Sequence, residues 1–292
     1  MNELHRMVIE AVKKLDVKTI TDIGKAYLFS GSLGAAFRDS DGKSLLMYAA
    51  MEGRIDAVAQ RIRKGEEIDA RDNYGNSTLV YAVKRRDMRM AAFLLDHGAD
   101  VDITDGKGRT PLMIAASETR DNAMAHVLLS KGADQSKVDN EGATALIHAV
   151  RSDSDYVAKL LVDNGADVNA RTGSGYTPIL YAVHNRSAKI VAILISKNAE
   201  LDVKNANGRT AIMQAAYTGN VEIVRTLADG GADLLVTDDY GKTAYDLACE
   251  RGHNMVIDFL RSRMISEPLE RSSDALASLK RSIARHRRAH EP

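Results

Sequence analysis

Residues that could carry catalytic or metal chemistry are few in this sequence, and they form no recognisable motif. The histidines and the single cysteine give no H-E-x-x-H motif and no cysteine pair of the kind that binds zinc. Gly173-Ser174-Gly175 is glycine-rich but lacks the Lys and Ser/Thr of a phosphate-binding loop. We therefore expect no catalytic residue, no cofactor and no metal, and predict that the protein is not an enzyme. The histidines are His5, His97, His126, His148, His184, His253, His286 and His290.

The number of cysteines and the lack of long apolar segments indicate the compartment in which we expect the protein. Cys249 is the only cysteine, which excludes an intramolecular disulfide and fits a reducing compartment. Cys249 lies beside the small residue Ala248 in a predicted helix, so we expect a buried structural thiol. Residues 1–18 mix charged with apolar residues, unlike a secretory signal, and no stretch approaches the roughly 18 apolar residues of a membrane span. We expect a soluble cytoplasmic protein, with export as an effector left open.

A glycine recurs along most of the chain at a fixed interval. The interval is 33 residues, except for one step of 34 between Gly108 and Gly142. A period of this length is typical of a stacked solenoid. The extra residue falls in the polar segment 117–122, which we predict to be a loop. The recurring positions are Gly42, Gly75, Gly108, Gly142, Gly175, Gly208 and Gly241.

One unit, residues 105–138, shows the elements that the repeat predicts. Its turn is rich in glycine, Thr110 can cap the helix that follows, and Pro111 suits the first helical position. Gly132 can end a second helix in the left-handed conformation. Helices of about ten residues are marginal alone, so each unit must bury its apolar face against the next.

These motifs resemble the ankyrin repeat, most clearly in Gly108-Arg109-Thr110-Pro111-Leu112 and in residues 165–170, G-A-D-V-N-A. The resemblance implies an all-α ankyrin-repeat solenoid of helix–turn–helix units with β-turn or hairpin fingers. The histidine that the family places after Pro-Leu is Met113 here, and other residues replace it elsewhere. We therefore expect the polar contacts of that histidine to be absent and the stack to depend more on apolar packing.

The repeat also predicts the domain boundaries. Residues 1–38 are interpreted as a helical cap or a degenerate repeat, and residues 267–292 as a basic C-terminal helix. The array between them, residues 39–266, divides into seven predicted units. These are 39–71, 72–104, 105–138, 139–171, 172–204, 205–237 and 238–266.

The resemblance implies a binding surface on the concave side of the solenoid, formed by the turns and the ends of the first helices. Basic residues and tyrosines are frequent at these positions, and both are favoured in protein interfaces. We therefore predict a monomeric scaffold or adaptor that binds an acidic protein partner. The alternative is that these charges only keep the protein soluble. The predicted partner-binding residues are Arg71, Tyr74, Lys84, Arg85, Lys107, Arg109, Arg151, Arg171, Tyr176, His184, Lys204, Arg209, Tyr217, Tyr240, Lys242 and Arg251.

Other hypotheses remain beside this one. The basic tail could bind nucleic acid or an anionic membrane through Lys280, Arg281, Arg285, Arg287 and Arg288. The protein could also regulate a separate enzyme or act as a secreted effector. The context of Asn169 resembles the sites that asparaginyl hydroxylases modify in ankyrin proteins, which makes it a candidate modification site.

Overall fold

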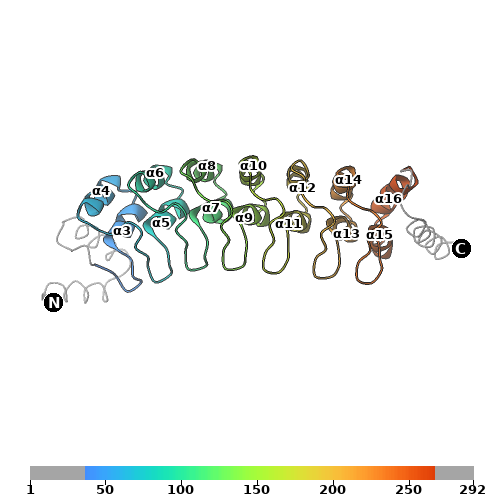
Figure 1. The fold of residues 1–292 in the computed structure, drawn as a ribbon, viewed down its shortest axis with the longest axis horizontal. Helices are drawn as coiled ribbons and strands as arrows, with labels where there is room; N and C mark the ends of the chain where they lie inside the picture. The colour runs from blue at the N-terminus through green and yellow to red at the C-terminus, as the bar shows by residue number, and fades with distance from the viewer. Residues whose placement is uncertain (1–36, 267–292) are drawn as a thin grey trace. The chain divides into compact units, whose positions relative to one another are not determined.

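The fold is described from a computed structural model that covers residues 37–266 (Figure 1). The predicted N-terminal cap, apart from its last two residues, and the predicted basic tail lie outside the described residues. The chain divides into two compact units, the first ending at Gly106 and the second beginning at Lys107, and each is considered by itself. Within residues 37–266 there are fourteen α-helices, one π-helix and no strand. The predicted all-α repeat fold is confirmed.

Unit 1 contains two described helix pairs. Helices α3 (Leu45–Met51) and α4 (Ile55–Arg63) form one pair, and α5 (Thr78–Lys84) and α6 (Met88–Asp96) form the other. Helices α3 and α5 pack side by side, and each contacts the second helix of its own pair. An isolated antiparallel bridge between Arg71 and Ser77 closes the turn that precedes α5. The core of unit 1 is formed by fully buried side chains, among them Leu46, Met47, Leu79, Met90 and Leu94.

Unit 2 continues the pattern in two rows of helices (Figure 1). The first row is α7 (Pro111–Ile114), α9 (Ala145–Arg151), α11 (Pro178–His184), α13 (Ala211–Tyr217) and α15 (Ala244–Arg251). The second row is α8 (Asn122–Ser130), α10 (Asp155–Asp163), α12 (Ala188–Ile195), α14 (Val221–Asp229) and α16 (Asn254–Ser266). Each helix contacts its neighbours in the row and its partner in the other row. The turns between pairs extend beyond the first row, and this arrangement buries the apolar faces of both rows.

The first-row helices begin where the sequence predicts. Thr110 is the N-cap of α7 and accepts a hydrogen bond from the backbone N–H of Met113, and Pro111 occupies the first helical position. Thr144 caps α9 in the same way. At the other end of the pair, Gly132 and Asn198 have positive φ values of 87° and 60°, as expected for left-handed caps.

The polar contacts expected to be lost with the family's histidine are instead made by other residues. Asp72 Oδ1 accepts the backbone N–H of Tyr74 at 2.9 Å and of Asn76 at 2.8 Å, and Tyr81 Oη donates to Asp72 Oδ2 at 2.5 Å. In unit 2, His148 Nε2 lies 2.8 Å from Asp139 Oδ2 in the equivalent arrangement. In these helix pairs a side chain one residue further along the helix holds the turn, so the expected loss of polar contacts does not occur there.

The extra residue of the 34-residue step does not lie in a loop. Residues Ala115–Thr119 form a π-helix directly after α7, and Thr119 Oγ1 donates to the carbonyl of Ala115 at 3.1 Å. A π-turn spans one residue more than an α-turn, so it absorbs an insertion without changing the helices on either side. Arg120 then ends the turn with a positive φ of 48°.

Successive helix pairs are also joined by a ladder of hydrogen bonds from backbone to side chain. In unit 1 the N–H of Asp100 donates to the carboxylate of Asp69 at 3.1 Å. In unit 2 the N–H of Glu200 donates to Asn169 Oδ1 at 2.8 Å, and the N–H of Asp233 donates to Asp202 Oδ1 at 2.9 Å. The candidate modification residue Asn169 is therefore part of this ladder, and its modification stays a prediction.

Candidate partner-binding surface

The end of each first-row helix lies close to the turn that begins the same helix pair. In unit 2 this proximity produces ion pairs between Arg109 and Glu118 at 2.7 Å, and between Arg151 and Glu141 at 2.8 Å. Lys242 and Glu250 form a third pair at 2.7 Å. Each pair joins a residue of the turn to one near the end of the helix or π-helix that follows, so it ties the turn to the helix and neutralises both charges.

Tyr217 departs from this pattern. It is the last residue of α13, and its ring receives the guanidinium of Arg209 from the turn, with the Cζ atom 4.6 Å from the ring centre. The guanidinium of Arg251, the last residue of α15, lies 4.7 Å from the same ring centre. We call Arg209, Tyr217 and Arg251 the tyrosine–arginine cluster. It brings two cations to one aromatic ring, whereas three other helix pairs of unit 2 bring together a cation and a carboxylate.

The position of Tyr217 is fixed by its backbone as well as by the arginines. His253 Nε2 lies 3.1 Å from the carbonyl oxygen of Tyr217, which links the end of α13 to the next helix pair. Arg209 Nε also lies 3.4 Å from Asp238 Oδ2, and the side chain of Asp238 is fully buried. Burial alone would raise the pKa of Asp238, but hydrogen bonds from the N–H groups of Lys242 and Tyr240 and from Arg209 lower it below its usual value. Asp238 is therefore ionised and balances one of the two arginines.

A second aromatic group lies on α11 and the turn before it. The rings of Tyr176 and Tyr181 are 5.3 Å apart, and the guanidinium of Arg151 lies 5.4 Å from the ring centre of Tyr181. Tyr181 is only half-buried, and the Arg151 guanidinium lies against its ring. The sequence carries no signal for this contact, because Tyr181 is separated from Arg151 by almost a full repeat.

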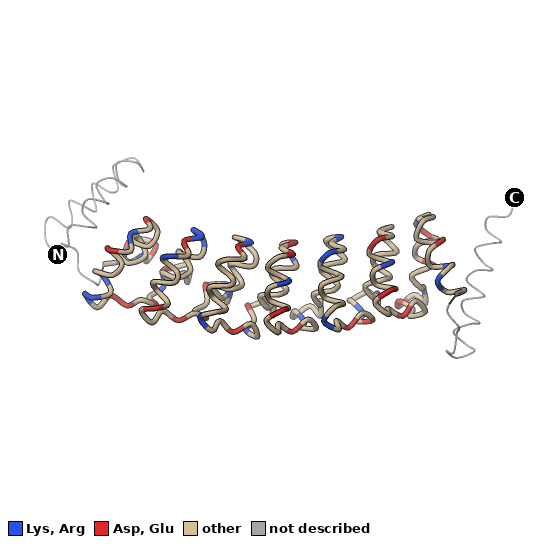
Figure 2. Tube along the Cα trace, turned by 90° about the horizontal axis from the view of Figure 1, so that it is seen from above, with Lys and Arg blue, Asp and Glu red and all other residues tan. Residues whose placement is uncertain are grey.

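None of the predicted partner-binding residues is buried. Many are already engaged within their own unit, however, as Lys84 is with Asn76 Oδ1 at 2.9 Å and Lys204 is with the carbonyl of Thr237 at 2.8 Å. Figure 2 shows basic and acidic segments interspersed within each unit. The exposed members are Arg71, Tyr74, Arg85, Lys107, Arg151, Arg171, His184, Lys204, Tyr240 and Arg251, and the remaining ones are partly exposed.

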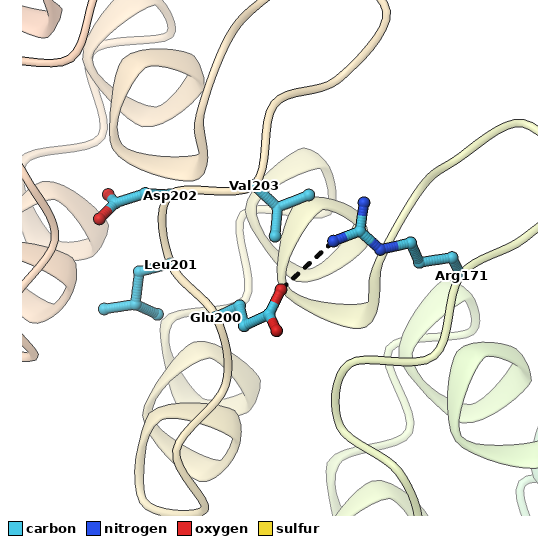
Figure 3. Close-up of a pocket in the computed structure, with 5 residues that line it drawn as sticks. All are labelled: Arg171, Glu200, Leu201, Asp202 and Val203. Carbon is cyan, nitrogen blue, oxygen red and sulfur yellow. Dashed lines mark hydrogen bonds and ion pairs between the residues drawn. The ribbon is translucent and has the colours of Figure 1, made fainter.

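Arg171 borders a shallow hollow of about 450 Å³ in unit 2 (Figure 3). Its guanidinium is 3.2 Å from Glu200 Oε2, and residues Leu201, Asp202 and Val203 complete the lining. The hollow is wide open to solvent and its only basic group is paired. It offers a small ligand little enclosure.

The groups considered for chemistry are not assembled into a reactive site in the part of the chain that the structure describes. Cys249 is half-buried, and its burial raises the pKa of the thiol to about 11, which keeps it protonated and unreactive. Between residues 37 and 266, no group of three or more His, Cys, Asp and Glu side chains could hold a metal ion. In the same residues, no helix is long and apolar enough to cross a membrane.

Comparison with known proteins agrees with the repeat and with the helix pairs. The family model for ankyrin repeats, three copies long, matches residues 17–105, 90–172, 112–205 and 179–267. The chain belongs to the ankyrin-repeat family. Ankyrin repeats form scaffolds for protein–protein interaction, and this array is such a scaffold.

Among solved structures, the ankyrin-repeat domain of Bcl-3, a member of the IkappaB protein family, resembles this chain with a TM-score of 0.69. The two are 29% identical, and the match covers 76% of this chain and 100% of that one. No curated protein matches the sequence.

Proposed function

We propose that unit 2 binds an acidic side chain of a protein partner at the tyrosine–arginine cluster, and that the array acts as a non-catalytic adaptor. The observation that carries this proposal is the convergence of Arg209 and Arg251 on the ring of Tyr217, at 4.6 and 4.7 Å. Tyrosine and arginine are the residue types that dominate the energetics of protein interfaces.

The charge at the cluster supports a carboxylate ligand. Arg209 is balanced by the buried Asp238, whereas Arg251 has no ion pair within the described residues. Arg251 is exposed, and its contact with the Tyr217 ring holds the guanidinium in place before a ligand arrives. One excess positive charge that is already positioned favours a single carboxylate, which can accept two hydrogen bonds from one guanidinium.

An apolar side chain beside the carboxylate would complete the contact. Tyr240 lies in the turn before α15 and is 76% exposed, the largest exposure among the apolar and aromatic side chains of the described residues. Lys242 Nζ lies 6.0 Å from the centre of its ring. We therefore expect the partner segment to carry an acidic residue close to a large apolar one.

The experiment selects ligands from a random peptide library with the full chain. We expect the selected peptides to be enriched in Asp and Glu, and Arg251→Gln to weaken binding of a selected peptide about tenfold, the usual scale for a charged hot spot. Tyr217→Leu should have a similar effect because it removes the surface that orients both guanidinium groups. Fluorescence anisotropy at two salt concentrations measures both variants.

The matched control is Arg171→Gln, which removes an exposed arginine of the same predicted set that is paired with Glu200 and lies outside the cluster. It should leave the affinity within about twofold. Equal losses for Arg171→Gln and Arg251→Gln, or a selection without acidic residues, would show that the cluster does not read a carboxylate. Circular dichroism of each variant confirms that the helices remain folded.

A further inference from the structure

The turn between α5 and α6 in unit 1 contains an arginine in a backbone conformation that suits glycine. Arg86 has a φ of 58°, and the equivalent residue after α3 is Gly53, with a φ of 70°. In unit 2 the same position is glycine after α13 and α15, at Gly219 and Gly252, and a non-glycine residue after the π-helix, α9 and α11, at Arg120, Asp153 and Arg186. An L-residue is strained in this region and glycine is not. Arg86 therefore lowers the stability of the fold relative to glycine, as the three non-glycine residues at this position in unit 2 also do.

Three arginines at this turn are exposed: Arg85 and Arg86 lie between the helices, and Arg89 lies in the first turn of α6. Arg85, Arg86 and Arg89 all face solvent, and within residues 37–266 none of them makes an ion pair or a side-chain hydrogen bond. We call them the turn arginines. The acid in their midst, Asp87, is already engaged, because its Oδ1 accepts the N–H of Met90 at 2.9 Å as the N-cap of α6. The equivalent turns of unit 2 hold at most one arginine between the two helices, Arg120 after the π-helix and Arg186 after α11, so the group of three arginines is confined to this turn.

We propose that the turn arginines bind a carboxylate-rich segment of a protein partner. The three arginines lie within five residues of sequence, and their mutual repulsion would fall once several carboxylates lie against them. Guanidinium groups also bind carboxylates through two parallel hydrogen bonds. This surface belongs to unit 1 and does not depend on the tyrosine–arginine cluster of unit 2.

The composition of the turn favours a polypeptide over other polyanions. Residues 84–90 include no aromatic side chain on which a nucleic-acid base could stack. Met88, 42% exposed, is the only exposed apolar side chain among them, too little apolar surface for insertion into a bilayer. Acidic side chains on a flexible segment can instead adapt to three closely spaced arginines.

The test measures binding of a fluorescent octaglutamate peptide to the full chain by anisotropy, in an R209Q/R251Q background that removes the unit 2 cluster. We expect binding to persist in this background at about 50 mM salt and to weaken about tenfold when R85Q, R86G and R89Q are added. R86G alone should weaken binding about threefold, while thermal unfolding shows a rise of about threefold in the folded-to-unfolded ratio. If R86G makes the protein more stable but weakens peptide binding, Arg86 serves binding. A residue with a structural role would instead lower the stability when it is replaced.

The matched control is R186G, since Arg186 is exposed and has the same left-handed conformation, with a φ of 59°, in unit 2. It should stabilise the fold as R86G does and leave peptide binding within about twofold. Unchanged binding in the triple variant, loss of all binding in the R209Q/R251Q background, or an equal loss in R186G would each overturn the proposal. Tighter binding of single-stranded DNA, or of phosphatidylserine vesicles, than of the peptide would overturn it as well. Failure of the unit 2 proposal would appear separately, in the Arg251→Gln variant.

Discussion

Arg61 and Glu66 form a buried ion pair in unit 1, with side chains 4% and 2% exposed and a separation of 3.3 Å. Glu66 Oε2 also accepts the N–H of Leu46 at 3.1 Å. Burial raises the pKa of Glu66, although Arg61 opposes this effect. In the next helix pair the equivalent residues are Leu94 and Ala99, both buried. An ion pair therefore stands where the repeat otherwise has apolar residues.

We expect Arg61→Leu alone to lower the free energy of unfolding by about 3–5 kcal/mol, because the buried Glu66 loses its ion-pair partner. Glu66→Ala alone should also lower it, because Arg61 loses this carboxylate. The double variant restores the leucine and alanine of the other helix pairs and should be as stable as the wild type or more stable. Urea unfolding of the four proteins measures the coupling. Additive losses in the double variant would contradict this expectation.

His148 gives the protein a predictable response to acid. Burial lowers its pKa below the value of about 6.5 expected in the unfolded chain, so the folded state binds fewer protons between the two values. The contribution of His148 to the free energy of unfolding is therefore complete above about pH 6.5, and it is lost as the pH falls below that value. Asp139 has a lowered pKa, because its hydrogen bonds outweigh its burial, and its contribution is lost only at more acidic pH.

The variant that tests this response is His148→Tyr, because Tyr48 and Tyr81 already donate to the equivalent aspartates in unit 1. We expect the variant to fold and to lose less stability than the wild type between pH 7 and pH 5. Urea unfolding at several pH values gives the two slopes. Identical slopes would mean that His148 does not titrate in this window.

At the scale of the element, the recurring turn glycine does more than allow a left-handed backbone. Gly65 and Gly75 have the same φ of 78°, but their surroundings differ. A Cβ atom at Gly75 would lie 2.5 Å from the backbone nitrogen of Gly106 in the next turn, whereas a Cβ atom at Gly65 would meet nothing within 4 Å. Gly75 is thus required for close approach of successive turns, whereas Gly65 is required only for its conformation, and so are the turn glycines Gly175 and Gly241, where a Cβ atom would also meet nothing within 4 Å.

We expect Gly65→Ala to lower the free energy of unfolding by about 1 kcal/mol, the cost of the left-handed conformation alone. Gly75→Ala should cost about 3 kcal/mol or more, since the turns must also move apart and strain the hydrogen bond from the N–H of Gly106 to the carbonyl of Tyr74 at 3.1 Å. Thermal unfolding compares the two. Equal costs would show that the turns can separate freely.

The helical elements themselves were predictable because their signals are local. Threonine caps, Pro111 and Pro178 at first helical positions, and left-handed glycines mark the helix ends within a few residues of sequence. The π-helix was not predictable, because the sequence shows only that one residue is added between Gly108 and Gly142. Whether a loop or a helix absorbs it depends on packing against α8 and α9.

At the scale of the whole molecule, basic and acidic residues are equal in number, and many of those on the surface form ion pairs with each other. The sequence predicted a basic surface by counting residues at equivalent positions, and those residues are accessible. It could not show that Arg109 and Arg151 are neutralised by Glu118 and Glu141, because pairing depends on distances across the turn. The two proposals therefore rest on Arg251 and on the turn arginines, which make no ion pair within residues 37–266.

The ladder that joins successive helix pairs has a direction. At Asp69, Asn169 and Asp202 the earlier residue in the chain accepts, and the backbone N–H that donates lies about one repeat later. During synthesis the accepting side chain leaves the ribosome first. Each folded pair therefore already presents an acceptor oxygen to the segment that emerges next. The array can therefore assemble in step with synthesis, because each new pair can pack on the pair that has just been completed.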